Sequence, residues 1–219
     1  MRTRRQFDAE LSALEAKLIL MGRKAGDMLE SAIISLIDSD VSVANDVILQ
    51  DEIVDTYNME LEAECMRLVI QQQPLAHDLR IVGMVYKAIA DVERIADHAV
   101  DIAKIARDIA SADRFERLVD VALLHDKVIR MFRSAMKSFE DHDVDLALRV
   151  IADDDEVDDL FMDQRAALLE IMEADALRRT LASHLIFVAQ FLERIGDRSV
   201  NIAERVHLLE RGERPVVTG

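Results

Sequence analysis

Apolar residues recur at alternating intervals of four and three along the first part of the chain. The positions are Phe7, Leu11, Leu14, Leu18, Met21, Ala25, Met28 and Ala32. This spacing is typical of a helix that packs along its whole length against other helices. It predicts a first helix that ends near Asp38, where Ser39 and Asp40 supply turn and N-cap chemistry.

Five further helices follow from the same reasoning. The pattern predicts them over about 41–72, from about 75 to 110–113, over about 121–141, from 143 onward, and over about 175–209. Pro74 separates the second helix from the third, because proline disfavours the helical conformation of the residue before it. Gly212 and Pro215 end helical structure near the C-terminus. The chain is therefore expected to be all-α.

The third and sixth predicted helices contain one repeated string. It reads ERIADHAVDIA from Glu93 and ERIGDRSVNIA from Glu193, 100 residues later, with seven of eleven positions identical. A second match, 103 residues apart, relates Val47, Ile48, Asp51, Val54 and Asp55 to Val150, Ile151, Asp154, Val157 and Asp158. The sequence thus predicts a tandem repeat of two antiparallel three-helix bundles, over residues 1–112 and 113–212, with a tail over 213–219.

The repeated string places acidic side chains four residues apart. On a helix, Glu93, Asp97 and Asp101 stack along one face, and most apolar residues lie opposite, so these carboxylates are expected to face outward. We call such a row of side chains, four residues apart on one helix face, a ladder. The second ladder consists of Glu193, Asp197 and Asn201. Like charges at this spacing destabilise a helix by roughly 0.2–0.5 kcal/mol per pair. A solvated surface explains one such pair, but recurrence in register favours a function.

Composition narrows the classes of partner. The net charge of −16 argues against nucleic acid and suits metal cations or basic protein surfaces. The single cysteine excludes an intramolecular disulfide, which fits a reducing compartment. No stretch approaches the roughly 20 apolar residues of a membrane span, and no signal peptide is recognised. We expect a cytoplasmic protein that does not insert into the membrane.

Clustered carboxylates without paired thiols or histidines are hard ligands, which suit magnesium, calcium, manganese or ferric iron. Further candidates for metal or partner contacts are Asp51, Asp55, Asp154 and Asp158. Periodicity leaves open whether these residues face the ladders. Arg94 and Arg194 are interpreted as ion-pair partners of the ladders or as partner contacts. His98 is a weak ligand candidate, because its counterpart, Arg198, cannot bind a cation.

Motifs of catalysis are missing from the sequence. It has no G-x-S-x-G, P-loop, G-x-G-x-x-G or H-E-x-x-H motif, so no catalytic residue is assigned. A ferritin-like di-iron centre needs two Glu-x-x-His motifs, and only Glu204 and His207 have that spacing. Two alternatives to a regulator stay open: a carboxylate-ligated metal-binding or storage protein, and a plain helical adaptor whose ladders are only surface.

Taken together, these motifs resemble the PhoU family. The resemblance rests on two tandem three-helix units, on the string QPLAHDLR over 73–80, and on the repeated ERIAD and ERIGD strings. It covers the chain from Phe7 to about Gly212. The family is associated with the phosphate-specific ABC transporter, and its fold is a pair of three-helix bundles.

The resemblance implies a negative regulator of the phosphate-starvation response and phosphate uptake. It implies partners, namely the transporter ATPase and a sensor histidine kinase, and a homodimer located at membrane complexes through those partners. It also implies metal at the ladders, either iron or magnesium, manganese or zinc, with no organic cofactor. Asn201 stands where the first copy has Asp101, so the second site is expected to hold metal differently.

Overall fold

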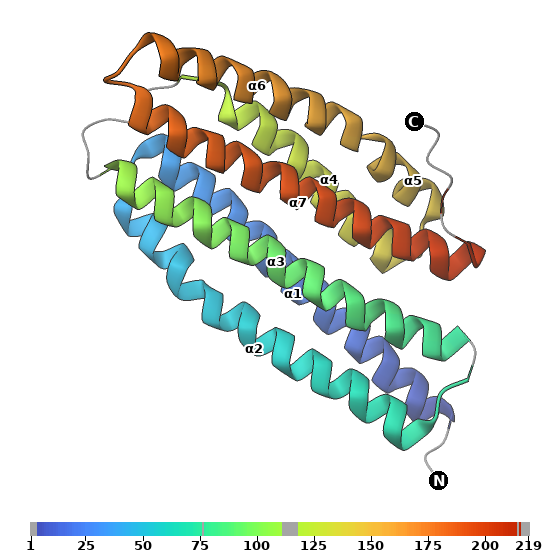
Figure 1. The fold of residues 1–219 in the computed structure, drawn as a ribbon. Helices are drawn as coiled ribbons and strands as arrows, with labels where there is room; N and C mark the ends of the chain where they lie inside the picture. Colours follow the sequence, from blue (N-terminus) through green and yellow to red (C-terminus); the bar gives the residue numbers. More distant parts are fainter. Residues whose placement is uncertain (1–3, 76, 111–117, 214, 216–219) are drawn as a thin grey trace.

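The computed structural model describes residues 4–75, 77–110, 118–213 and 215. Within these residues the fold consists of α1 (Arg4–Asp38), α2 (Val41–Gln72), α3 (His77–Ala110), α4 (Val121–Asp141), α5 (Val144–Ala152), α6 (Asp154–Ala174) and α7 (Arg179–Arg211) (Figure 1). The predicted all-α tandem repeat of three-helix bundles is confirmed. The expected domain boundary at 112/113 lies outside the described residues.

The first turn of each bundle is built in the same way. Ser39 and His142, 103 residues apart, both adopt a left-handed conformation with φ of 54°. Each is followed by an aspartate N-cap: Asp40 accepts from the backbone N–H groups of Ser42 and Val43, and Asp143 accepts from that of Leu146. These bonds satisfy N–H groups that a helix start leaves unpaired. The repeat read from the sequence therefore extends to the local geometry of the turns.

The prediction of one continuous fifth helix is wrong. The backbone leaves the helical pattern at Asp153, so that α5 and α6 are separate helices. Acidic residues fill the first turn of α6, where the positive end of the helix dipole favours them over a position in mid-helix. The last helix also begins later than expected, at Arg179. The carboxylate of Asp175 accepts from the N–H of Leu177 and forms a turn before it.

The two bundles lie side by side, an arrangement that periodicity alone did not decide. Helix α3 packs against α7, and α1 packs against α4. Figure 1 shows α3 and α7 running alongside each other in opposite directions, with α2 on one flank and α5 and α6 on the other. Four helices therefore form the centre of the molecule, while α2 and α6 each cover one side of a ladder-bearing helix.

Close packing between α1 and α4 depends on two small residues. A Cβ atom at Gly22 would lie 2.5 Å from Cε of Met136, and one at Gly26 would lie 3.6 Å from the ring of Phe132. Arg133 of α4 also pairs with Glu30 of α1, with 2.9 Å between Nη2 and Oε1. The core at this seam is aliphatic and aromatic, and the charged pair closes its edge.

Candidate functional site

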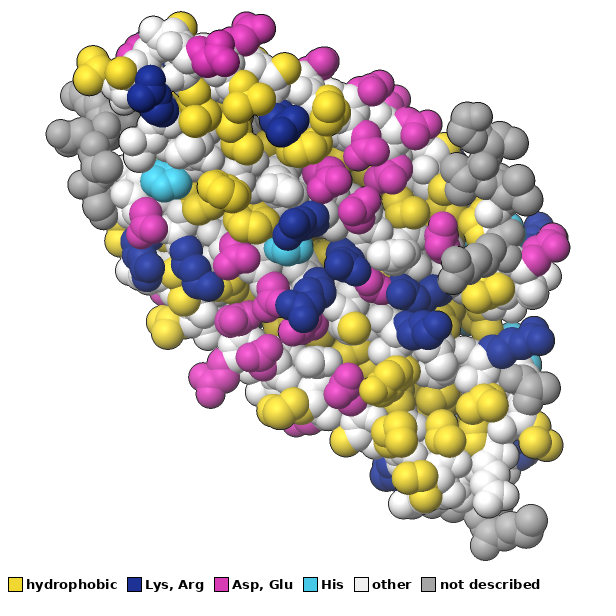
Figure 2. Space-filling view, viewed as in Figure 1, with side chains coloured by type: hydrophobic (Ala, Val, Ile, Leu, Met, Phe, Trp, Pro, Cys, Tyr) yellow, Lys and Arg dark blue, Asp and Glu magenta, His cyan; other side chains and the backbone are white. Residues whose placement is uncertain are grey.

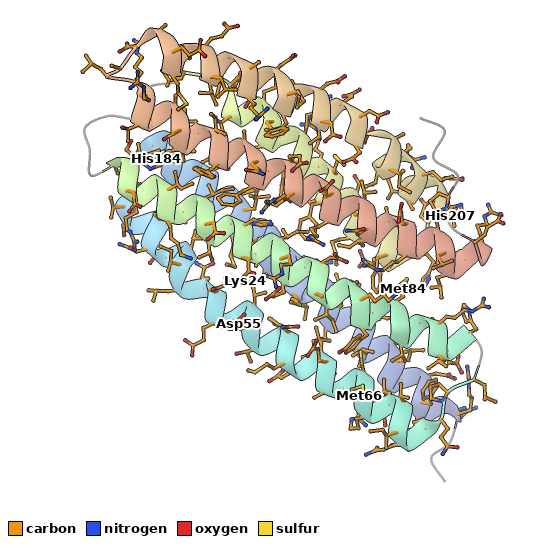
Figure 3. All side chains as sticks on the ribbon, in the orientation of Figure 1. Lys24, Asp55, Met66, Met84, His184 and His207 are labelled. Carbon is orange, nitrogen blue, oxygen red and sulfur yellow. The ribbon has the colours of Figure 1, made fainter. Side chains whose placement is uncertain are left out.

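The first ladder is half-buried rather than fully outward. The side chains of Glu93, Asp97 and Asp101 on α3 are 22%, 32% and 40% exposed. Helix α2 packs along this side of α3 and brings its own acidic residues with it. Asp55, labelled in Figure 3, lies on α2. The sequence interpretation missed this cover because a single-helix pattern does not show which neighbour lies over its polar face.

Acidic residues of α2 and α3 meet at this contact. Burial is the largest cause that raises the pKa of Asp51, and the neighbouring charge of Asp55 raises it further. The charges of Asp97 and Asp101 on α3 add to the rise, while Lys104 opposes it. We name Asp51, Asp55, Glu93, Asp97 and Asp101 the first acidic cluster. The open question of whether Asp51 and Asp55 face the ladder is answered: they do.

Burial also raises the pKa values of two ladder carboxylates in the first acidic cluster. Burial raises the pKa values of Glu93 and Asp97 more than any other single contribution. Mutual repulsion raises the pKa of Glu93 further, through Asp97 and then through Asp55 and Asp51. Folding thus holds several negative charges together and removes part of their water. Such a site gains free energy from a cation or a basic partner.

A second acidic cluster repeats the arrangement between α6 and α7. It consists of Asp154, Asp158, Glu193 and Asp197. Burial, followed by the charges of Asp158 and Asp197, raises the pKa of Asp154 to about 7. Burial likewise raises the pKa values of Glu193 and Asp197, with repulsion by Asp158 adding to both. Both bundles therefore carry a partly desolvated acidic cluster at equivalent places.

Gly196 explains the tight approach of α6 to α7. A Cβ atom at this position would lie 3.3 Å from Cγ1 of Val157 and 3.6 Å from Oδ1 of Asp154. The first copy has Ala96 at the equivalent position. The missing methyl group lets the carboxylate of Asp154 come close to the backbone of α7, where it loses water. The departure from Ala96 to Gly196 therefore changes the approach of the acidic side chain.

Arginines next to the ladders offset part of the repulsion. Nη1 of Arg94 lies 2.9 Å from Oδ2 of Asp97, and its Nε lies 3.5 Å from Oε2 of Glu93. In the second cluster, Arg194 lowers the pKa values of Glu193 and Asp197, which identifies it as a nearby compensating charge. Figure 2 shows Lys and Arg side chains along the α3–α7 region, between acidic groups over the two flanks.

The donor set of both clusters fits a hard cation, because it contains carboxylate oxygens. In the part of the chain that the structure describes, no group of three or more His, Cys, Asp or Glu side chains is placed to hold a metal ion. Binding of an ion therefore requires carboxylates of a cluster to change rotamer and converge. Burial is the largest cause of their raised pKa values, and repulsion between neighbouring carboxylates, which such an ion would relieve, adds to it.

His98 lies at the seam between the bundles. Its ring stacks on Phe191 of α7, with 5.3 Å between the ring centroids and 20° between the planes. Burial lowers the pKa of His98 to about 4, so the ring is neutral near pH 7. The position is explained by packing against α7, and it gives no support to a ligand role.

The sequence reasoning missed a buried charged group at the same seam. Asp91 on α3 is 4% exposed, and it forms ion pairs with Arg198 and Arg205 of α7. The signal was available: Asp91 lies between Ile89 and Val92, within the apolar arc of its helix. Asn201, the last rung of the second ladder, lines a cleft between α3 and α7 next to Arg205.

The sequence matches the family model described as the PhoU domain twice, over residues 18–106 and 121–206. The chain belongs to the PhoU family. The two matched segments carry the two acidic clusters, one in each. Helices α3 and α7, which meet at the seam, are thus equivalent elements of two family domains.

Relatives of similar length and fold support the family assignment. The chain is 32% identical over 213 residues to the phosphate-specific transport system accessory protein PhoU homolog of Clostridium acetobutylicum, covering 97% of each chain. It is 32% identical over 210 residues to the Escherichia coli K12 protein PhoU, covering 95% of this chain and 86% of that one. The crystal structure of PhoU from Pseudomonas aeruginosa has a TM-score of 0.92 at 32% identity, covering 94% of this chain and 100% of that one.

The PhoU structure from Streptococcus pneumoniae has the same fold. It gives a TM-score of 0.87 at 24% identity and covers 96% of this chain and 100% of that one. Among the described residues, none of the helices contains an apolar stretch of the length needed to cross a bilayer.

Proposed function

We propose that this protein is a non-enzymatic regulator of phosphate uptake, which represses the phosphate-starvation response when phosphate is plentiful. It acts in the cytoplasm, as a homodimer, between the ATPase of the phosphate ABC transporter and a sensor histidine kinase. The observation that carries the proposal is membership of the PhoU family, through two matched domains and through relatives named as accessory proteins of phosphate-specific transport.

The acidic clusters supply the surface for such a role. Each cluster contains at least four carboxylates. Burial and mutual repulsion raise the pKa values of several of them, so their negative charges are only partly compensated within the protein. A basic surface on a partner protein relieves that repulsion on binding. Because charge attraction between exposed groups is screened over about 8–10 Å at physiological salt, it sets the rate and orientation of encounter, while apolar contacts hold the complex.

A deletion and complementation experiment tests the proposal. Deleting the gene should switch the phosphate-starvation genes on in phosphate-rich medium, and the wild-type chain should silence them again. Glu93→Gln with Asp97→Asn, and Glu193→Gln with Asp197→Asn, should remain helical and lose partner binding or repression. Glu52→Gln, an exposed acid on the same helix as Asp55, is the matched control.

Two results would contradict the regulatory role. One is a deletion strain in which phosphate still silences the response. The other is full binding and repression by both double variants. Association of the purified protein with the transporter ATPase or with the cytoplasmic part of the kinase, measured by surface plasmon resonance, should slow as salt rises.

A second proposal is that the clusters hold metal ions, either iron or magnesium, manganese or zinc. The specific observation in its favour is the raised pKa of Asp154, about 7, to which burial contributes most and the neighbouring charges of Asp158 and Asp197 add. Asp154, Asp158, Glu193 and Asp197 would hold one ion, and the first cluster another. A bound ion would supply positive charge that joins two helices of one bundle.

Metal analysis of the purified protein tests this second proposal. The variant Glu93→Gln with Asp97→Asn should lower the bound metal of the first bundle, and Glu193→Gln with Asp197→Asn that of the second. Wild-type metal content in both double variants would refute the metal sites and leave the clusters as partner surfaces. A turnover activity that the same variants abolish would favour a metal enzyme instead of a regulator.

A further inference from the structure

A cleft opens between the first half of α3 and the last half of α7, and none of the residues of the two acidic clusters lines it. Its volume is about 390 Å³. The cationic lining residues are Arg80 and Lys87 from α3 and Arg205 from α7. Met84, labelled in Figure 3, lies on α3 toward α7 and belongs to the apolar lining. Residues of both bundles therefore line the cleft.

Positive charge predominates in this cleft, although the protein as a whole is strongly acidic. Among the described residues, Arg80 and Lys87 form no ion pair or hydrogen bond, and both are exposed. Arg205 shares the single buried carboxylate of Asp91 with Arg198, so these three side chains together carry one positive charge in excess. Only Glu204 adds a negative charge to the lining.

The net charge of −16 does not cancel this local excess at physiological salt. The screening length is then about 8 Å, so the field of distant carboxylates is weakened. An anion in the cleft would lie directly beside the unpaired side chains of Arg80 and Lys87, so its electrostatic attraction to them outweighs repulsion by the distant carboxylates. Guanidinium groups, with several N–H donors in a fixed fork, suit phosphate oxygens.

The rest of the lining is largely apolar, which suits a ligand with an organic part better than a bare inorganic ion. Met84 and Leu209 are buried, and Leu208 is 40% exposed at the rim. Gly83 has no side chain, and a Cβ atom there would meet nothing within 4 Å. Asn201 adds an amide with both donors and an acceptor. A volume of about 390 Å³ falls in the range of small-molecule pockets.

We propose that this cleft binds a phosphorylated organic molecule of about nucleotide size, with its phosphate on Arg80, Lys87 and Arg205 and its apolar or aromatic body on Met84, Leu208 and Leu209. The ligand bridges α3 and α7, and therefore stabilises the packing of one bundle on the other. Binding here goes beyond the proposed regulation of phosphate uptake and does not depend on it, because it is a property of the isolated chain.

Calorimetric titration of the purified full chain tests the cleft, in buffer without divalent metal so that the acidic clusters do not contribute. The probes are AMP, GMP, UMP, glucose 6-phosphate and inorganic phosphate. At least one nucleotide should bind at least tenfold more tightly than inorganic phosphate and than glucose 6-phosphate, which lacks an apolar body. Its affinity should fall as salt rises.

Two sets of variants locate that binding. Arg80→Gln with Lys87→Gln should weaken the nucleotide at least tenfold, and Gly83→Leu should do the same by filling the cleft with a side chain. Arg130→Gln, which removes the charge of an exposed arginine on α4 outside the cleft lining, is the matched control and should bind as wild type does. Circular dichroism should show that all the variants are equally helical.

Three outcomes would overturn the proposal: no nucleotide binds, inorganic phosphate binds as tightly as every nucleotide, or the Arg80 and Lys87 variant binds nucleotide unchanged. None of these outcomes bears on repression in the deletion strain, so failure of the cleft is distinguishable from failure of the regulatory role.

Discussion

Asp91 on α3 forms an ion pair with Arg198 on α7. The repeat offset of 100 residues relates Asp91 to Phe191 and Arg198 to His98, and these two equivalent residues also contact each other. Such reciprocal contacts arise when two equivalent helices pack antiparallel about an approximate two-fold axis. The seam between the bundles thus resembles a symmetric dimer interface within one chain. On one side of this axis lies the ion pair of the buried Asp91, and on the other side lies the pair of stacked rings.

The symmetry predicts that a pair of stacked rings can also form at the equivalent contact, between positions 91 and 198. Asp91→Phe alone should lower the free energy of unfolding by about 3 kcal/mol or more, because Arg198 and Arg205 lose their buried carboxylate. Adding Arg198→His places two rings at the equivalent contact, and should give a favourable coupling of about 1 kcal/mol. Urea unfolding of both single variants and the double variant measures this coupling. Additive losses would show that the two contacts are not equivalent.

A second prediction concerns pH and His98. The pKa of His98 is about 4 in the fold, against an ordinary value of 6.5. Well above pH 6.5 the ring is neutral in both the folded and the unfolded chain. As pH falls from 6.5 towards 4, only the unfolded chain gains the proton, so stability is lost on acidification.

From pH 7.5 to pH 5.0 this single group should cost the wild type about 2 kcal/mol. His98→Phe should therefore lose about 2 kcal/mol less than wild type over that interval in urea unfolding. His77→Gln, at an exposed histidine, is the control and should follow wild type. Parallel losses in wild type and His98→Phe would mean that the ring is accessible to protons.

The third prediction concerns the stability of the first acidic cluster without metal. Glu93→Gln with Asp97→Asn removes repulsion between half-buried carboxylates but also the ion pair with Arg94, which is mostly exposed. Exposed pairs contribute little, so the free energy of unfolding should stay the same or rise by up to about 0.5 kcal/mol. Thermal unfolding in the presence of a chelator, beside Glu52→Gln, measures it. A loss above about 1 kcal/mol would show that the carboxylates stabilise the fold.

The fourth prediction contrasts two helical glycines. Gly83 faces open space, so Gly83→Ala should raise the free energy of unfolding by about 0.5–1 kcal/mol through helix propensity. Gly196→Ala should give little or none of this gain, because its Cβ atom would lie 3.3 Å from Cγ1 of Val157. Denaturant unfolding compares the two variants directly. Equal gains would mean that α6 shifts freely away from α7.

The sequence by itself determined the helices, the repeat and the acidic residues of each ladder. Spacing of apolar residues is a local property, so the end of α1 at Asp38 and the extent of α4 over 121–141 were predicted nearly to the residue. Turn and cap residues such as Asp40 also act locally. The acidic residues of each ladder were predicted for the same reason, since they lie at a fixed interval on one helix, whereas Asp51, Asp55, Asp154 and Asp158 were identified through the repeat without showing that they face the ladders.

Only the tertiary structure decided which helices face each other. Spacing did not show the break at Asp153, because Val150 and Val157 on either side of it keep the seven-residue interval of a continuous helix. Asp51 meets Asp97, and Asp91 meets Arg205, through packing of surfaces that are far apart in the chain. Burial then raised the pKa values of the ladder carboxylates. A periodic pattern identifies the face of a helix, but the partner of that face is set by the free energy of packing the whole molecule.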